Sequence, residues 1–284
     1  MKIGFVGLGV MGGPMAGHLA AAGHDVAVFN RSNVKAAQWV EHHVGRMAAS
    51  VTEVAGGQDL LILCVGADHD VRGVVSEALP ALPNGAIIVD HTTTSARLAR
   101  EMAATARDAG VSFLDAPVSG GEAGAKSGKL AIMIGGEVGA VERAMPVLNA
   151  YAKAIKHMGA PGAGQLTKMV NQICIAGVVQ GLAEAVAFAD KAGLDPTLVY
   201  EAVSQGAAQS WQMDNRWATM TRGEFEFGFA VDWMRKDLGL VLDEARSNGA
   251  RVEVTALIDQ FYAEVQSLGG RRWDTSSLAA RQKR

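Results

Sequence analysis

A glycine-rich loop between an expected strand and an expected helix constrains this chain more than any other feature. Residues 2–6 form an apolar run of strand length, and residues 15–22 are good helix formers. The residues between them include the G-x-G-x-x-G sequence Gly7, Leu8, Gly9, Val10, Met11 and Gly12. In this context the first glycine makes a tight turn, the second lets backbone approach a pyrophosphate, and the third lets helix pack on strand. The loop therefore predicts a dinucleotide site, with a glycine-rich turn that binds nothing as the alternative.

The end of the second expected strand, residues 25–29, indicates which dinucleotide is bound. An NAD enzyme usually has an acidic residue here, which accepts a hydrogen bond from the ribose 2′-hydroxyl. This chain instead has Asn30, Arg31 and Ser32. Because Arg31 can pair with a 2′-phosphate and stack on adenine, we expect NADP. The alternative is that Arg31 is a surface charge and that NAD is also used.

Further strand signals alternate with helical intervals along the chain. They lie at residues 60–65, 86–90, 111–114, 130–134 and 154–157. Such alternation predicts an α/β fold with a parallel, doubly wound sheet, in which ligands bind outside the carboxyl ends of the strands. Val65 follows one of these strands, and Thr93, with the threonines on either side of it, follows another, so we expect them near the cofactor. Residues 92–95 could also cap the helix expected at 96–109.

A second glycine-rich segment follows the strand at 111–114. It contains Ser119, Gly120 and Gly121, and further glycines continue to Gly128. Backbone N–H groups beside a serine hydroxyl can surround an anion such as a small carboxylate. A structural turn is the alternative.

A long helix is expected from Gln165 to Ala192, after the glycines at 162 and 164 and before Gly193. Its middle is so apolar that we expect it to be buried nearly all round. Lys168 and Asn171 share one face near its start because they are three residues apart. A lysine at a helix start is most often only a solvated charge, so this pair alone leaves a catalytic role open.

The overall composition is that of a globular protein. The chain has 284 residues, of which 49% are hydrophobic, and a net charge of −3. The only basic block is the short tail at 281–284, so nucleic-acid binding is not expected. Cys64 and Cys174 both lie in apolar runs and are expected to be buried thiols in a reducing, cytoplasmic setting. No metal-ligand spacing is present, and polar residues interrupt the long helix, so we expect neither a metal nor a membrane span.

The last part of the chain is predicted to be helical. Apolar residues recur at helical spacing over 233–248 and 254–268. We place the domain boundary near Pro161, between a dinucleotide-binding domain at 1–161 and a helical substrate and dimerisation domain at 162–284. A ridge of small residues along the long helix would allow close approach of another helix, within the domain or across a dimer. Several side chains could line a substrate pocket or belong to the core: Trp211, Met213, Trp217, Phe229, Asp232 and Trp233.

Taken together, four blocks resemble the 3-hydroxyacid dehydrogenase family, which includes 3-hydroxyisobutyrate dehydrogenases and tartronate semialdehyde reductases. The blocks are GFVGLGVMGGPMAGHLAAAG at 4–23, DAPVSGGEAGAKSGKL at 115–130, GAGQLTKMVNQ at 162–172 and KDLGLVLDEA at 236–245. The resemblance implies an N-terminal Rossmann domain, an all-α C-terminal domain with a long interdomain helix, and a homodimer or homotetramer.

The resemblance also implies roles for single residues. Lys168 would be the catalytic acid/base, and Asn171 would hold the substrate. Ser119, Gly120 and Gly121 would bind the substrate carboxylate, while Thr93 and Lys236 would contact the cofactor. The expected activity is hydride transfer between a small 3-hydroxy acid and its semialdehyde.

A departure from the related phosphogluconate dehydrogenases narrows this expectation. Phosphogluconate dehydrogenases carry Lys-x-x-His-Asn, whereas Asn171 here stands three residues after Lys168 and no histidine follows it. Decarboxylation is therefore not expected. A non-catalytic NADP-binding protein, structural or regulatory, is the remaining alternative.

Overall fold

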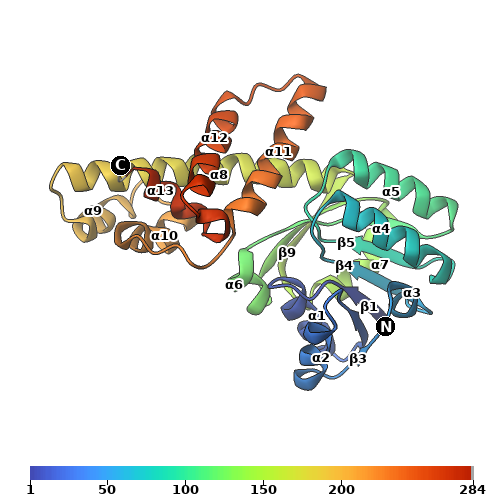
Figure 1. Cartoon of the computed structure of the whole chain (residues 1–284). Helices are drawn as coiled ribbons and strands as arrows, with labels where there is room; N and C mark the ends of the chain where they lie inside the picture. The colour runs from blue at the N-terminus through green and yellow to red at the C-terminus, as the bar shows by residue number, and fades with distance from the viewer. Residues whose placement is uncertain (283–284) are drawn as a thin grey trace. The chain divides into compact units, whose positions relative to one another are not determined.

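The chain folds as two units, Met1–Lys168 and Met169–Arg284. The structure is a computed structural model and describes residues 1–282, so that Lys283 and Arg284 of the basic tail lie outside it. The first unit combines a sheet with helices, and the second is helical (Figure 1). Helix α8 (Ala163–Lys191) begins in the first unit and continues into the second.

The sheet of the first unit has the strand order β3-β2-β1-β4-β5-β6-β8-β7, with β9 paired to β8. The strands are β1 (Lys2–Val6), β2 (Asp25–Phe29), β3 (Arg46–Met47), β4 (Leu60–Leu63), β5 (Ile87–Asp90), β6 (Ser112–Asp115), β7 (Val118–Ser119), β8 (Leu130–Gly135) and β9 (Ala152–Gly159). The doubly wound prediction is confirmed for β1 to β6, which are parallel. The parallel prediction is wrong for β8, which runs antiparallel to β6, and for β9, which pairs parallel to β8.

The parallel strands end in register. Val6 lies opposite both Phe29 and Leu63, Leu63 lies opposite Asp90, and Asp90 lies opposite Asp115. Because the chain leaves all five strands at the same level, the loops that follow them meet at one edge of the sheet. This edge holds the glycine-rich loop together with Asn30, Arg31, Ser32, Val65 and Thr93, which follow β2, β4 and β5.

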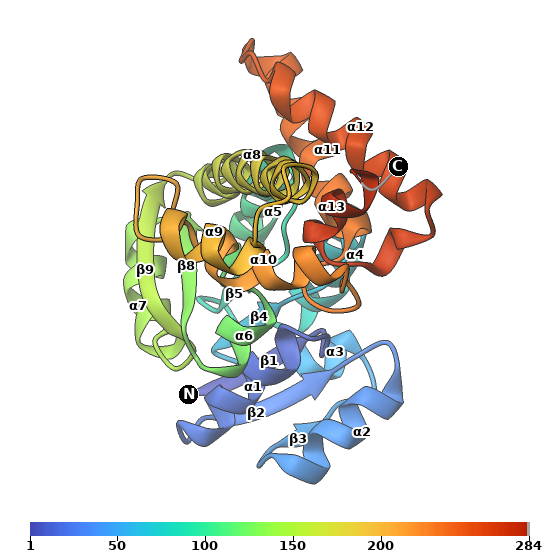
Figure 2. The same cartoon turned by 90° about the vertical axis from the view of Figure 1, so that its left-hand side faces the viewer.

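Helices cover both faces of this sheet. One apolar core joins it to α1 (Gly12–Ala21), α2 (Asn33–His42), α6 (Gly121–Lys126) and α7 (Val138–Leu148). A second core joins its other face to α3 (Val51–Ala55), α4 (Asp68–Ala78) and α5 (Ala96–Asp108). In Figure 2, α7 lies beside β9, which pairs with β8. The continuous apolar runs of the central strands therefore follow from burial on both faces.

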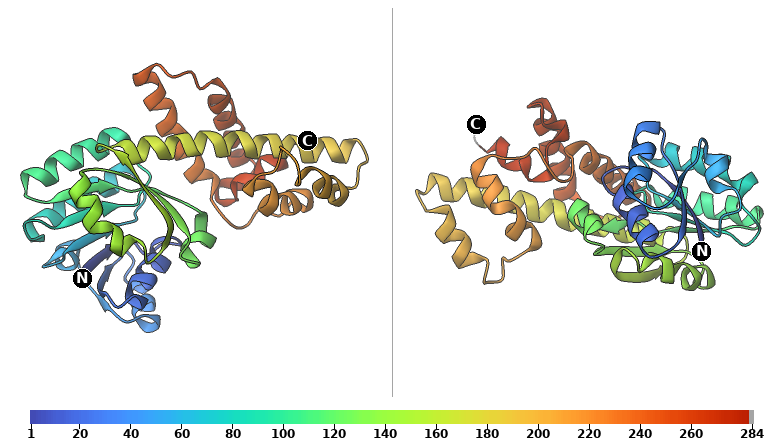
Figure 3. Two further views of the ribbon diagram at one scale, coloured as in Figure 1. Left: turned by 180° about the vertical axis from the view of Figure 1, so that it is seen from behind. Right: turned by 90° about the horizontal axis from the view of Figure 1, so that it is seen from below.

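The second unit packs helices around the far part of α8. These helices are α9 (Pro196–Val203), α10 (Trp211–Arg222), α11 (Val231–Asn248), α12 (Glu253–Ser267) and α13 (Leu278–Arg281). Val179, Leu182 and Val186 of α8 belong to the core of this unit, together with residues of α10, α11, α12 and α13. Figure 3 shows α11 and α12 side by side as a helical hairpin. The helices predicted at 233–248 and 254–268 are confirmed.

The predicted helix at 165–192 is confirmed, but its predicted burial is wrong. Val170, Val178 and Phe188 are exposed, and Phe188 reaches 73%. Within the described residues, α8 is long and apolar enough to cross a membrane, although 44% of its most apolar window is buried. A core helix of a soluble protein passes the same test. The helix is apolar on two sides, but only one of them is covered by the rest of the described chain.

The prediction that both cysteines are buried is also wrong. Cys174 is exposed on α8, and Cys64 is half-buried. Their apolar neighbours in the sequence indicated burial, but Cys174 points away from the core face of its helix. Neither forms a disulfide bond within the described residues.

Candidate active site

The glycine-rich loop has the geometry that a pyrophosphate site needs. Gly7 has a φ of +99°, and a Cβ there would overlap the Cys64 carbonyl oxygen. A Cβ at Gly12 would overlap the carbonyl oxygen of Gly7 itself. A Cβ at Gly9, by contrast, would meet no atom within 4 Å. Close backbone packing therefore explains Gly7 and Gly12, whereas Gly9 leaves open space at the start of α1, the position predicted for a dinucleotide phosphate.

The segment after β2 supports this loop and presents one cation. Asn30 accepts a hydrogen bond from the Leu8 backbone N–H at 2.9 Å, and its Nδ2 donates to the Ser32 carbonyl at 3.1 Å. The Arg31 side chain is 96% exposed, and its Nη1 lies 4.0 Å from Asp70 Oδ1. Asn30 thus fixes the loop, while the guanidinium of Arg31 remains accessible to a ligand.

The loop after β5 joins neighbouring strand ends. The Val65 N–H donates to Thr92 Oγ1 at 3.0 Å, and the Thr92 N–H donates to Asp90 Oδ1 at 2.9 Å. Ser95 accepts from the Leu98 N–H at 3.0 Å, so the expected capping of α5 is confirmed. Thr93 lies half-buried in the middle of this loop. Its contact with a cofactor remains a prediction.

Ser119 and its glycines lie where β7 passes into α6. Ser119 pairs with Ala131 of β8, and Gly120 and Gly121 have φ values of +130° and +61°. These left-handed conformations favour glycine and turn the chain sharply after the serine. His18 of α1 donates through Nε2 to carbonyl oxygens in the last turn of α6, at 3.0 and 3.1 Å. The helix of the dinucleotide site therefore also holds the element that follows the serine loop.

Lys168 is buried at 8% exposure and lies in the second turn of α8. The helix start is held by Asp115, which accepts from the Gly162 N–H at 2.8 Å and the Gln165 N–H at 2.9 Å. Burial raises the pKa of Asp115 to about 6, although these backbone donors oppose the rise. The lysine therefore stands on a helix start that is fixed to the end of β6, and it is not a solvated surface charge.

In the second unit, two other predicted residues belong to one polar network. Asn171 donates to Gln172 Oε1 at 2.8 Å, and Gln172 donates to Asp237 Oδ2 at 2.7 Å. Lys236 Nζ lies 3.3 Å from Asp237 Oδ1 and 5.6 Å from the centre of the Trp233 ring. The sequence interpretation named Asn171 and Lys236 but missed the two buried residues that join them. Their only sequence signal is that each directly follows a predicted site residue.

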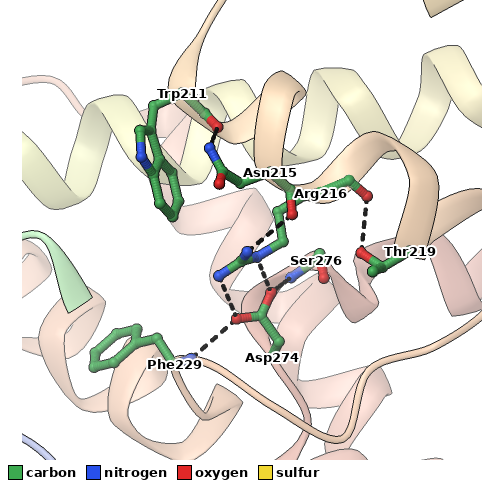
Figure 4. A network of polar contacts seen from close by, with 7 residues as sticks. All are labelled: Trp211, Asn215, Arg216, Thr219, Phe229, Asp274 and Ser276. Carbon is green, nitrogen blue, oxygen red and sulfur yellow. Dashed lines mark hydrogen bonds and ion pairs between the residues drawn. The ribbon is translucent and has the colours of Figure 1, made fainter. Parts of the chain in front are cut away.

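A buried ion pair shapes the segment before α11 (Figure 4). Arg216 Nε donates to Asp274 Oδ1 at 2.9 Å, and the two side chains are 16% and 1% exposed. Asp274 also accepts from the backbone N–H groups of Phe229, at 2.9 Å, and Ser276, at 3.0 Å. The guanidinium lies 5.2 Å from the centre of the Trp211 ring. One carboxylate therefore fixes the backbone that carries Phe229.

The side chains considered for a substrate pocket differ in burial. Met213 and Trp217 are buried in the helical core, which was the alternative to a place in the substrate pocket. Trp211, Phe229 and Trp233 are partly exposed, at 52%, 38% and 41%. Asp232 accepts a hydrogen bond from Gln266. Among residues 1–282, no group of three or more His, Cys, Asp and Glu side chains could hold a metal ion.

Comparison with known proteins identifies the relatives of this chain. A family profile for the NAD-binding domain of 6-phosphogluconate dehydrogenase matches residues 2–159. A profile for the NAD-binding region of NADP-dependent 3-hydroxyisobutyrate dehydrogenase matches residues 162–281. An uncharacterised oxidoreductase of Shewanella frigidimarina is 57% identical over 99% of this chain and 97% of its own length.

Two further relatives have assigned activities. The 2-hydroxy-3-oxopropionate reductase of Escherichia coli K12 is 34% identical over 98% of this chain and 96% of its own length. The solved structure of Mycobacterium tuberculosis 3-hydroxyisobutyrate dehydrogenase with L-serine is 32% identical, with a TM-score of 0.91. The match covers 100% of this chain and 99% of that one.

Proposed function

The chain belongs to the 3-hydroxyacid dehydrogenase family of NAD(P)-dependent oxidoreductases, and we propose that Lys168 is its general acid/base. The substrate pair is a small 3-hydroxy acid and its semialdehyde, and no decarboxylation accompanies the reaction. The buried position of Lys168 carries this proposal, because its helix start is fixed to β6 at the edge of the sheet that holds the glycine-rich loop. The comparisons give no support to a non-catalytic role.

The proposed mechanism divides the reaction into a hydride step and a proton step. When bound, the nicotinamide cofactor accepts or donates the hydride. Neutral Lys168 removes the hydroxyl proton during oxidation, and protonated Lys168 donates a proton to the aldehyde oxygen during reduction. Asn171 holds the substrate, and Lys236 contacts the cofactor. Placing the acid/base on a fixed helix start keeps the proton transfer at one position.

The proposed carboxylate site is the segment of Ser119, Gly120 and Gly121. The serine hydroxyl and the two glycine N–H groups would hold a small carboxylate, and the positive φ values are compatible with this role because backbone turns of this kind can form anion-binding concavities. A carboxylate fixed there would set the orientation of the carbon that reacts. Substrates without the carboxylate would then bind weakly.

The proposed cofactor is NADP, with NAD as a weaker alternative. The exposed Arg31 follows β2 where NAD enzymes usually have an acidic residue. The cofactor would lie on the loop from Gly7 to Gly12, beside Asn30, Ser32, Val65 and Thr93. The profile of NADP-dependent enzymes that matches residues 162–281 also supports this choice.

The helical part is proposed to form a homodimer, alone or as half of a tetramer. The exposed side of α8 carries Val170, Val178 and Phe188, with Gly177 and Gly181 between them. A Cβ at either glycine would meet nothing within 4 Å, so nothing in the described chain makes the close approach that the small residues allow. We assign residues 1–161 to the cofactor, residues 162–284 to substrate binding and dimerisation, and the protein to the cytoplasm.

A substrate panel followed by nicotinamide absorbance tests this function. NADP and NAD would each be paired with 3-hydroxyisobutyrate, 3-hydroxypropionate, serine and glycerate. The reduced cofactors would be paired with glyoxylate, succinic semialdehyde and tartronate semialdehyde. Turnover with NADP preferred is the expected result. Tight NADPH binding without turnover of any substrate would contradict the proposed reaction.

A further inference from the structure

Gln165 uses its whole carboxamide to hold the loop after β5. The side chain is fully buried, and its Nε2 donates to the Thr92 carbonyl oxygen at 2.7 Å. Its Oε1 accepts from the Thr94 backbone N–H at 3.0 Å. The two hydrogen bonds enclose Thr93, the residue expected to contact the cofactor. One side chain thus fixes the backbone on both sides of that threonine.

The helix start that carries Gln165 has little freedom to move. The Gln165 N–H donates to Asp115 Oδ2 at 2.9 Å, and the Gly162 N–H donates to Asp115 Oδ1 at 2.8 Å. A Cβ at Gly164 would lie 2.5 Å from the carbonyl oxygens of both Asp115 and Met133. Backbone at the end of β6 and in β8 therefore packs directly against this turn.

Lys168 follows Gln165 by three residues and lies on nearly the same side of the helix. From these contacts we propose that Gln165 is a positioning residue, which fixes Lys168 relative to the loop around Thr93. The proposal rests on the assignment of Lys168 as the acid/base. The Gln165 amide thereby links the start of α8, which carries Lys168, to the loop expected to contact the cofactor.

The role requires one donor and one acceptor at the same side-chain tip. Glutamate has the same shape, but when ionised it turns an acceptor instead of a donor toward the Thr92 carbonyl, while its other oxygen still accepts from the Thr94 N–H. When protonated, it restores the pattern, since its O–H donates to Thr92 and its carbonyl accepts from Thr94. Burial raises the pKa of such a carboxyl, so the change falls within an accessible pH range. Methionine fills the space without making either hydrogen bond.

The first test compares Gln165→Glu and Gln165→Met with wild type in aldehyde reduction. We expect Gln165→Met to lower kcat on the order of 100-fold at every pH, because a displacement of about 1 Å is enough for such a loss. Gln165→Glu should show a similar loss at high pH. As the pH falls from roughly 8 to 5.5, the kcat of Gln165→Glu relative to that of wild type should rise by up to about tenfold per pH unit.

Gln180→Met is the matched control. Gln180 is also buried on α8, but its amide donates only to Glu184 of the same helix. This variant should keep wild-type kcat even if its melting temperature falls as far as that of Gln165→Met. A purely structural role for Gln165 would instead produce the same activity in the two methionine variants.

The second test needs neither substrate nor turnover. Hydrogen exchange of the Thr94 amide should be faster in cofactor-free Gln165→Met than in wild type and Gln180→Met, and NADPH should bind more weakly. Unchanged exchange, or a Gln165→Glu rate ratio that does not vary with pH, would overturn the proposal. If Lys168→Ala retained turnover, the proposed function would fail separately, while the exchange result would still decide whether Gln165 holds the loop.

Discussion

Arg31 is the residue on which the cofactor preference should depend. Replacing it with alanine should raise the KM for NADP by about 10- to 100-fold, because charge-assisted hydrogen bonds to the 2′-phosphate are lost. The KM for NAD should stay nearly constant. Arg46→Ala is the control, since that arginine pairs with Asp25 at the opposite end of β2. Equal losses with both cofactors would show that Arg31 does not select the phosphate.

His91 should make the stability of the protein depend on pH. The ring is fully buried, with Nδ1 donating to the Ala116 carbonyl and Nε2 accepting from the Tyr151 hydroxyl. Desolvation lowers its pKa to about 4. Above about pH 6.5 the ring is neutral in both the folded and the unfolded state. Between these values only the unfolded state binds the proton, so stability falls as the pH falls.

Urea denaturation of wild type and His91→Gln measures this contribution. The free energy of unfolding of wild type relative to the variant should fall by about 3 kcal/mol between pH 7 and pH 4. The raised pKa of Asp115 acts in the opposite direction in both proteins, and the comparison removes it. A difference that stays constant with pH would show that His91 does not titrate as described.

At the residue level, the sequence predicted what depends on local spacing. Gly7 was expected to make a tight turn and Gly12 to let the helix pack on the strand, and a Cβ at either position would overlap neighbouring backbone. The roles of Gln165 and Asp115 could not be predicted, because their hydrogen bonds join residues that lie 47 to 73 positions apart. A local periodicity or motif does not reveal contacts between residues so far apart in the sequence, although both residues lie inside the blocks that resemble the family.

Among the elements, long periodic segments were predictable and short or exposed ones were not. The extent of α8 followed from its composition, but which side of it is covered depends on the rest of the fold. The two-residue strands β3 and β7 have no pattern of their own. The antiparallel pairing of β6 and β8 could not be predicted, because an apolar run in the sequence does not show in which direction its strand runs.

The ion pair of Arg216 and Asp274 should stabilise the segment between α10 and α11 strongly. Asp274→Ala leaves a mostly buried guanidinium and two backbone N–H groups without their acceptor, which should cost about 3–5 kcal/mol of unfolding free energy. Glu224→Ala removes an exposed pair with Arg222 and should cost less than about 1 kcal/mol. Equal losses in chemical denaturation would contradict the assigned role of burial.

For the whole chain, the order of an α/β part and a helical part was predictable from the change in periodicity after the last strands. The arrangement of strands at one edge followed from the alternation of strands and helices. The oligomeric state was harder to predict, because small residues on α8 allow a close contact without showing which helix makes it. The structure shows in addition that one apolar side of α8 is left uncovered by the described chain.

Phe188 tests the proposed dimer. Phe188→Glu places a charge on the exposed apolar side of α8 and should convert the protein to monomers in sedimentation velocity. Val44→Glu is the control, because Val44 is 85% exposed in the first unit and far from α8 in the sequence. A wild-type protein that is monomeric at micromolar concentration would contradict the proposal directly.

The role of Lys168 is the central claim, and the turnover of Lys168→Ala tests it most directly. The rate with NADPH and the best semialdehyde should fall by about 10²- to 10⁴-fold, which is the usual contribution of a general acid/base. The dissociation constant for NADPH should remain close to that of wild type, and Lys191→Ala at the far end of α8 should turn over normally. A Lys168→Ala enzyme that keeps more than about a tenth of the wild-type kcat would contradict the account.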